Sequence, residues 1–214
     1  MLSIFLVIGY LITIFSLTII LKRLFPNNKE LLRKIIHIGI GPLVPLAQLI
    51  AINQQTAQYL AGSITILILL NYIYKLFPII EDIDRKSYGT LFYCLSLFIL
   101  ISIYWDKDPL ALITGSLIMS FGDGLAGLIG KNFPSKNWQI LKQKKSLLGT
   151  GTMFLVSFIV IIFVTYWGEL NISFSCFYIA CIATLLEQFS LMGIDNFTVP
   201  IVSALVFNLL ITNL

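Results

Sequence analysis

Residues 109–130 read PLALITGSLIMSFGDGLAGLIG, and this stretch decides the class of the protein. Among its 22 positions, Asp123 is the one charged residue. A helix that crosses the hydrocarbon core of a bilayer needs about 20 mostly apolar residues. The stretch therefore predicts a transmembrane helix that carries a single carboxylate.

Similar apolar stretches fill the rest of the 214 residues. The overall composition agrees, because 58% of the residues are hydrophobic and 11% are charged, whereas soluble domains average about 45–50% and about 25%. We expect an all-α integral membrane protein with one transmembrane domain over 1–214, a bundle of about eight helices, some kinked or broken, and no soluble domain. The expected spans are 2–21, 35–52, 57–75, 89–105, 109–130, 147–167, 174–193 and 197–213.

The span at 35–52 is expected to be kinked or broken, because it contains two glycines and two prolines, at positions 39, 41, 42 and 45. Cys94, Cys176 and Cys181 lie in apolar runs without a ligand spacing. We expect them to act as small hydrophobic residues rather than to form disulfides or a zinc site.

Basic residues predict the orientation in the membrane. The connections after the first, third and fifth spans hold 13 of the 14 lysines and arginines, and Lys107 is the exception. Such connections face the cytoplasm, or the stroma in a plastid. Both termini are then expected on the opposite side.

Asp123 is the most informative of the polar residues, which gather toward the basic side. A carboxylate at membrane depth costs about 2.5–3.5 kcal/mol, so it is expected to face protein, water or a cation. The small residues around it, SFGDGLAG at 120–127, allow another helix or a ligand to approach closely. We interpret Asp123 as a metal or ligand carboxylate; the alternative is a hydrogen-bonded aspartate in a glycine-rich helix interface.

Two further acids lie at similar positions near the basic side. With Asp123, Glu187 and Asp195 would supply two or three carboxylates to a divalent cation, and Mg²⁺ commonly uses one or two carboxylates plus substrate phosphates. The alternatives are a helix-pairing role for Glu187 and a turn role for Asp195.

A basic segment, KQKKSLLGTG at 142–151, leads into the span at 147–167. Lysines, hydroxyls and free N–H groups at a helix start suit a phosphate, although the order of residues differs from that of a Walker A loop. The alternative is a flank that only sets orientation. His37, which shares a helix face with Arg33, is either a packing residue or part of the site, and the charged run at 81–87 is either a solvated connection or a source of Asp84 or Arg85.

These features together predict an intramembrane site for a polyphosphate and a divalent cation that opens to the cytoplasm. A substrate that reaches it from the bilayer would be a lipid. Phosphoryl transfer needs metal and basic groups around the phosphates and a positioned attacking oxygen, and the residues present fit that reaction.

Several motifs resemble the polyprenol kinase family, which includes phytol kinases, dolichol kinases and CTP-dependent diacylglycerol kinases. They are RKIIHIG at 33–39, GDGLA at 122–126, KSLLGT at 145–150, Glu187 and DNFTVP at 195–200. The resemblance covers roughly 33–200, and the first motif with the compact length is most similar to cyanobacterial and plastid phytol kinases. Two departures are a missing glycine after Gly130 and a chain shorter than dolichol kinases.

The resemblance implies CTP-dependent transfer of a γ-phosphate to a lipid alcohol, most simply phytol or a related prenol, within tocopherol or chlorophyll-related metabolism in a bacterial, cyanobacterial or plastid membrane. It implies Mg²⁺ as cofactor, CTP (or UTP) as donor, membrane lipids as surroundings and no nucleic-acid partner. The implied catalytic residues are Asp123, Asp195 and His37, and the implied metal ligands are Asp123, Glu187 and Asp195. The implied nucleotide-binding residues are Arg33, Lys34, Lys131, Lys144, Lys145, Ser146, Gly149 and Thr150.

Three other functions stay open at this point. One is a CTP-dependent diacylglycerol kinase. Another is a phosphatidate cytidylyltransferase, although that family usually has a second aspartate three residues after the first, where this chain has Ala126. The most distant is a secondary transporter, which should show an internal repeat and polar groups reachable from both faces.

Overall fold

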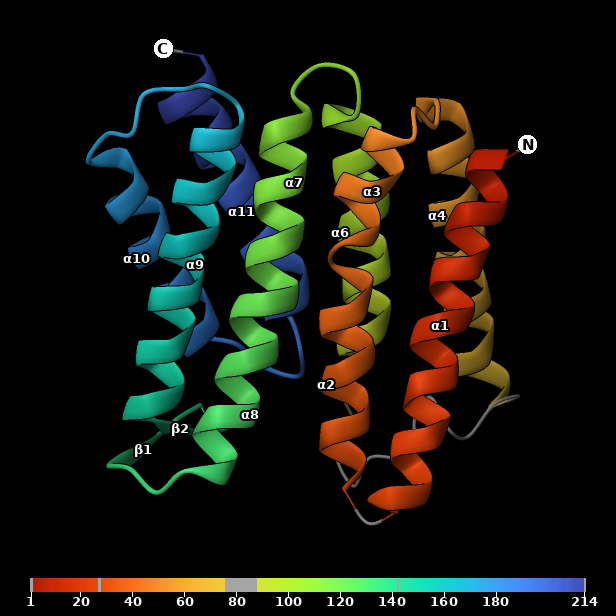
Figure 1. Ribbon diagram of the computed structural model, residues 1–214. Helices are drawn as coiled ribbons and strands as arrows, with labels where there is room; N and C mark the ends of the chain where they lie inside the picture. The colour runs from red at the N-terminus through yellow and green to blue at the C-terminus, as the bar shows by residue number, and fades with distance from the viewer. Residues whose placement is uncertain (1, 27, 76–87, 142, 214) are drawn as a thin grey trace.

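The apolar stretches form helices that stand side by side (Figure 1). The computed structural model describes residues 2–26, 28–75, 88–141 and 143–213. The first helices are α1 (Leu2–Leu24), α2 (Lys29–Ile40), α3 (Leu43–Leu49), α4 (Gln54–Tyr74) and α6 (Gly89–Tyr104). They are followed by α7 (Pro109–Leu117), the π-helical turn η1 (Ile118–Asp123), α8 (Gly124–Asn132), the antiparallel strands β1 (Asn137–Ile140) and β2 (Gln143–Ser146), α9 (Leu147–Trp167), α10 (Ser175–Gln188), α11 (Asp195–Phe207) and η2 (Asn208–Thr212).

Polar residues at the helix starts define where several helices begin. A side-chain oxygen at each of these positions accepts a hydrogen bond from a backbone N–H in the first turn, which satisfies a donor that the helix itself leaves free. The capping residues are Asn28 for α2, Asn53 for α4, Asp108 for α7 and Ser146 for α9.

The predicted break in the span at 35–52 is confirmed. Helix α2 ends at Ile40, and α3 begins after Gly41 and Pro42, because proline lacks the N–H that a continuous helix needs. A Cβ atom on Gly41 would lie 1.9 Å from Oγ of Ser120. The break therefore lets α2 and α3 pack closely against η1.

Each of the eight expected spans contains at least one helix in the structure. Among the described residues, five helices are long and apolar enough to cross a membrane, and α6 and α10 are apolar but shorter. The structure therefore supports a helical membrane protein, and the described residues form no soluble domain. The count of eight crossings stays a prediction.

The described connections lie at the two ends of the bundle. Both termini lie at one end, and the connection from α1 to α2 and the β1–β2 hairpin lie at the other (Figure 1). Among the described basic residues, Lys107 belongs to the first end, and that second end holds Lys22, Arg23, Arg33, Lys34, Lys131, Lys136, Lys144 and Lys145. Which end faces the cytoplasm or stroma stays a prediction.

The core lies around α7, where every residue from Ala111 to Leu117 is buried. A Cβ atom on Gly115 would lie 2.3 Å from the carbonyl oxygen of Pro200 in α11, so these two helices touch backbone to backbone. Around this pair, α9 packs on α8 and α10, and α4 packs on α6. The three cysteines are free thiols within α6 and α10.

The expected boundary between the last two spans is wrong. The apolar run suggested a helix to residue 193 and a surface turn at Asp195, but α10 ends at Gln188 and Asp195 is the first, buried residue of α11. Met192 (φ 51°) and Gly193 (φ 88°) are both left-handed, a conformation that interrupts a helix.

Candidate active site

An open cavity of about 1260 Å³ lies at the basic end of the bundle. Parts of α2, α8, the β1–β2 hairpin, α9 and the turn between α10 and α11 line it. Every predicted site residue except His37 belongs to its lining: Arg33, Lys34, Asp123, Lys131, Lys144, Lys145, Ser146, Gly149, Thr150, Glu187 and Asp195. The volume exceeds the roughly 300–1,000 Å³ of typical small-molecule pockets.

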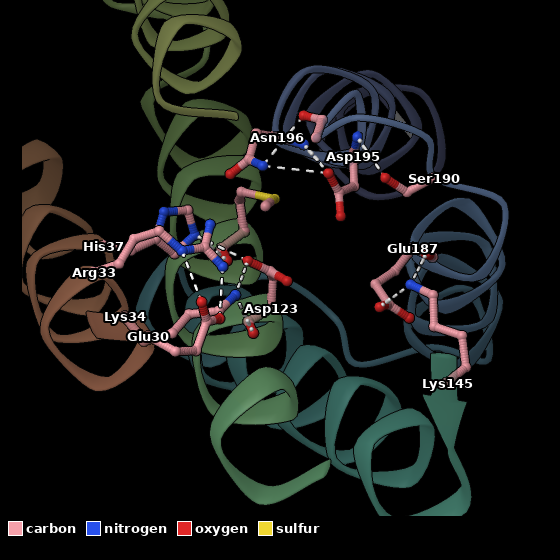
Figure 2. Close-up of polar contacts among 12 residues, drawn as sticks. Glu30, Arg33, Lys34, His37, Asp123, Lys145, Glu187, Ser190, Asp195 and Asn196 are labelled. Carbon is pink, nitrogen blue, oxygen red and sulfur yellow. Dashed lines mark hydrogen bonds and ion pairs between the residues drawn. The ribbon is translucent and has the colours of Figure 1, made fainter. Parts of the chain in front are cut away.

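One face of α2 supplies the first wall. Glu30, Arg33, Lys34 and His37 are spaced by three or four residues, so they share one side of the helix. Figure 2 shows this row beside Asp123. The charged residues of the motif at 33–39 therefore lie on one face of α2, as their spacing in the sequence predicts.

Lys34 is paired with Asp123 across 89 residues of sequence. Its Nζ donates to Oδ2 of Asp123 at 2.6 Å and to the Asp123 carbonyl oxygen at 3.1 Å. Lys34 reaches this position by passing over Gly127, where a Cβ atom would lie 2.6 Å from its Cε. Gly127 is thus a site residue that the sequence suggested only as part of a glycine-rich stretch.

His37 lies behind this pair rather than in the cavity lining. Its Nε2 is 3.4 Å from Oδ2 of Asp123 and 3.1 Å from the carbonyl oxygen of Met119. Its ring lies against that of Tyr93, tilted by 43° with 4.6 Å between centroids. This placement suits a residue that orients Asp123, and it corresponds to the packing alternative more than to direct contact with a nucleotide.

Lys145 and Glu187 form the second buried pair (Figure 2). Nζ of Lys145 donates to Oε1 of Glu187 and, at 2.6 Å, to its carbonyl oxygen. The amide of Gln188 donates to Oε2 of Glu187 at 2.9 Å and to Oγ1 of Thr150 at 2.8 Å. Gln188, which sequence reasoning missed because it adjoins an acid in an apolar run, therefore links α10 to α9.

Asp195 differs from the other two carboxylates, because no lysine or arginine among the described residues forms an ion pair with it. Its Oδ1 accepts from the backbone N of Asn196 at 3.1 Å and from the Asn196 amide at 3.2 Å. The residue is 8% exposed, and it points into the space that Asp123 and Glu187 also face (Figure 2). Its Oδ2 has no hydrogen bond within the described part of the chain.

The start of α9 does not offer the free N–H groups that the sequence suggested. The N–H of Leu147 donates to the Lys136 carbonyl at 2.9 Å, and that of Gly149 donates to Oγ of Ser146 at 3.1 Å. The N–H of Leu148 lies 3.4 Å from Oγ of Ser135. Ser146 and Gly149 line the cavity, but phosphate binding there would depend on side chains.

Two lysines at the cavity are available for an anion. Lys131 and Lys144 line the cavity and are exposed, and neither forms an ion pair with another described residue. Arg33 already pairs with Glu30, with Nη2 2.6 Å from Oε1. Burial alone would raise the pKa of Glu30, but its hydrogen bond to Arg33 and the nearby positive charges hold that pKa below the ordinary value.

A metal ion would need ligands from outside the protein here. The described residues contain no group of three or more His, Cys, Asp or Glu that could hold a metal ion by themselves. The three carboxylates nevertheless supply the hard oxygen donors that Mg²⁺ prefers, and it usually completes its shell with phosphates and water. The residues fit a cation that arrives with a nucleotide. The charged run at 81–87, with Asp84 and Arg85, lies outside the described residues.

Comparisons with known proteins place the chain in a family. The chain is 35% identical over 195 residues to the phytol kinase of Synechocystis sp., covering 87% of this chain and 82% of that protein. It is 26% identical over 209 residues to the probable chloroplastic phytol kinase of Triticum aestivum, covering 87% and 69%, and 26% identical over 198 residues to probable phytol kinase 2 of Glycine max, covering 87% and 67%. No family model and no solved structure matches the chain. The chain belongs to the polyprenol kinase family, and the relatives that show this are phytol kinases.

Proposed function

We propose that this protein is a lipid-alcohol kinase that transfers the γ-phosphate of CTP to phytol or a related prenol and releases the lipid monophosphate. The observation that carries the proposal is the cavity, which brings three carboxylates, two paired lysines and two unpaired lysines to one end of a membrane bundle. Its relatives' names support a prenol as the acceptor. The choice of CTP as the phosphate donor rests on the resemblance to the polyprenol kinase family.

The described side chains divide into three roles. Lys131 and Lys144 are free to bind the phosphates, with Arg33 beside them. Asp123 and Glu187 would hold Mg²⁺ together with the nucleotide, and their paired lysines, Lys34 and Lys145, would then be available to phosphate oxygens. When bound, the metal neutralises phosphate charge and orients the γ-phosphoryl group.

Asp195 is the best placed proton acceptor, because its carboxylate is buried and has no cationic partner among the described residues. The hydroxyl oxygen of the alcohol forms a bond to the γ-phosphorus while the bond from that phosphorus to the β–γ bridging oxygen breaks. CDP leaves with the bridging oxygen, and the hydroxyl proton passes to Asp195. His37 keeps Asp123 oriented from behind.

The test uses detergent-purified protein with Mg²⁺ and γ-labelled CTP, offered phytol, farnesol, a short dolichol and diacylglycerol in parallel. Label is expected in phytol or another prenol, and unlabelled ATP or UTP in excess tests the choice of donor. Asp195→Asn should lower kcat roughly 10²–10⁴-fold, as the loss of a general base does. Asp106→Asn, an exposed aspartate at the opposite end, is the matched control.

Other outcomes identify the other functions. Label in diacylglycerol indicates the diacylglycerol kinase, and label released as pyrophosphate with phosphatidate as substrate indicates the cytidylyltransferase. Folded protein that labels no lipid, and instead moves a solute into proteoliposomes along an ion gradient, indicates a transporter.

A further inference from the structure

The turn between α10 and α11, residues 189–194, combines two properties that rarely occur together. Its backbone is held by two hydrogen bonds: Oγ of Ser190 accepts from the N–H of Asp195 at 3.3 Å, and the carbonyl of Met192 accepts from the N–H of Tyr88, the residue just before α6, at 3.1 Å. Its four large apolar side chains are nevertheless all exposed: Phe189, Leu191, Met192 and Ile194. We call this segment the apolar turn.

The apolar turn lies short of the end of the bundle that the β1–β2 hairpin occupies (Figure 1). Helices α9 and α10 are packed neighbours joined at the end opposite the cavity (Figure 1). With 21 residues in α9 and 14 in α10, a rise of 1.5 Å per residue leaves α10 about 10 Å shorter. The chain therefore turns short of the level that the β1–β2 hairpin reaches (Figure 1), and the exposed apolar side chains of the turn fit a hydrocarbon surrounding.

The apolar turn also belongs to the polar cavity. Leu191 and Met192 line the same space as Lys131, Lys144 and Asp195, and Asp195 follows the turn directly. An occupant of this corner meets apolar side chains on one side and an unpaired carboxylate oxygen on the other. A lipid with one hydroxyl group satisfies both, because its chain packs on Leu191 and Met192 while its hydroxyl donates to the carboxylate.

We propose that the apolar turn is the acceptor subsite: a long-chain alcohol passes from the bilayer over Leu191 and Met192 and places its hydroxyl at Asp195, while the nucleotide occupies the lysine side of the cavity. This assignment rests on the proposed function for the phosphate step. It makes Leu191 and Met192 determinants of the preference for a long apolar chain, through burial of methylene groups.

The first test maps the subsite without any reaction. A long-chain alcohol with a photoreactive diazirine near its hydroxyl end is irradiated with the unmodified protein in detergent, and labelled peptides are identified by mass spectrometry. Label within 189–196, displaced by excess phytol, is expected. Specific label that maps to other segments instead overturns the subsite, and so does label at 189–196 that excess phytol leaves in place.

The second test uses kinetics. Leu191→Gln and Met192→Gln together keep side-chain length but remove apolar lining, so KM for phytol should rise about tenfold or more, the scale of lost apolar pocket contacts. KM for CTP, and kcat/KM for a short soluble alcohol, should not change. Leu155→Gln, an exposed leucine on α9 outside the cavity, is the control. An equal rise in the control, or a rise in KM for CTP, overturns the subsite.

The two proposals fail separately. Photolabel in the apolar turn without phosphorylation of any lipid would refute the proposed kinase activity but support an alcohol-binding site at the turn. Phosphorylation of a lipid together with photolabel only at other segments would support the kinase activity but refute the acceptor subsite at the apolar turn.

Discussion

Replacing Lys34 by methionine removes the ammonium group 2.6 Å from Oδ2 of Asp123 while keeping nearly the same side-chain volume. The side chains of Lys34 and Asp123 are 4% and 12% exposed, so solvent screens the pair weakly. Breaking a buried ion pair from one side costs about 3–5 kcal/mol, because the remaining charge is buried without a partner. We therefore expect Lys34→Met to lower the free energy of unfolding by about that amount.

The assay is denaturant unfolding in mixed micelles, followed by circular dichroism, for the wild type, both single variants and the double variant Lys34→Met/Asp123→Asn. The expected single loss corresponds to two or more orders of magnitude in the unfolding constant, at about 1.4 kcal/mol per factor of ten. Removing both charges should recover most of it, because a neutral pair of similar size leaves no unpaired charge. All three variants should lack phosphorylation activity, including the double variant whose stability is recovered.

The more exposed pair in the same helix provides the control. Arg33 and Glu30 have side chains 32% and 24% exposed, so Glu30→Gln should cost no more than about 1 kcal/mol, as accessible ion pairs do. If Lys34→Met costs no more than Glu30→Gln, or if the double variant is as unstable as the sum of its two single variants, the buried-pair reasoning is refuted.

Three further outcomes follow from the site. Gly127→Ala would place a Cβ atom 2.6 Å from Cε of Lys34 and should lower kcat about 100-fold by displacing that lysine. Gly151→Ala, whose Cβ atom would have no other atom within 4 Å, should instead stabilise α9 by about 0.5–1 kcal/mol. An equal loss of activity in the two variants would contradict this expectation. The pKa of Glu30 is held below its ordinary value. Its pairing with Arg33 therefore stabilises the protein above the pKa of Glu30 in the unfolded chain, and this stabilisation is lost as pH falls through the pKa in the folded protein. The difference in free energy of unfolding between wild type and Glu30→Gln should be largest at neutral pH and vanish in acid; a difference that does not depend on pH would contradict this reasoning. Lys131→Gln and Lys144→Gln together should raise KM for the nucleotide about tenfold or more, at about 1.5–3 kcal/mol for a charged hydrogen bond, without a change in melting temperature, whereas Lys107→Gln at the opposite end should change neither.

Helix positions were predictable from the sequence because long apolar runs, caps and breakers act locally. The run at 109–130 and the break at Gly41 and Pro42 are read directly from residue type. The membership of the cavity was also predictable in large part, since basic connections on one side of a membrane bring their charges to one end. These are properties of single segments.

The pairings inside the cavity were not predictable in the same way. Lys34 meets Asp123 only because α2 packs against η1 in one rotation, and Lys145 meets Glu187 only because β2 lies against the end of α10. Hydropathy also failed at the end of α10, since Phe189 and Leu191 are as apolar as a helix interior while Met192 and Gly193 turn the backbone. Backbone geometry overrode composition there, as it did where internal hydrogen bonds occupied the start of α9.

The π-helical turn η1 sets the rotational phase of α8, which continues directly from it. A π turn contains about one residue more than an α turn, and one residue corresponds to about 100° around a helix axis. Helices α7 and α8 are therefore rotated relative to each other about the helix axis. The residues of α7 face the buried core, while α8 turns Gly127 toward Lys34. Loss of a single codon within 118–122 would close the π turn and swing α8 by that angle, leaving a membrane-competent bundle whose glycine no longer faces its lysine.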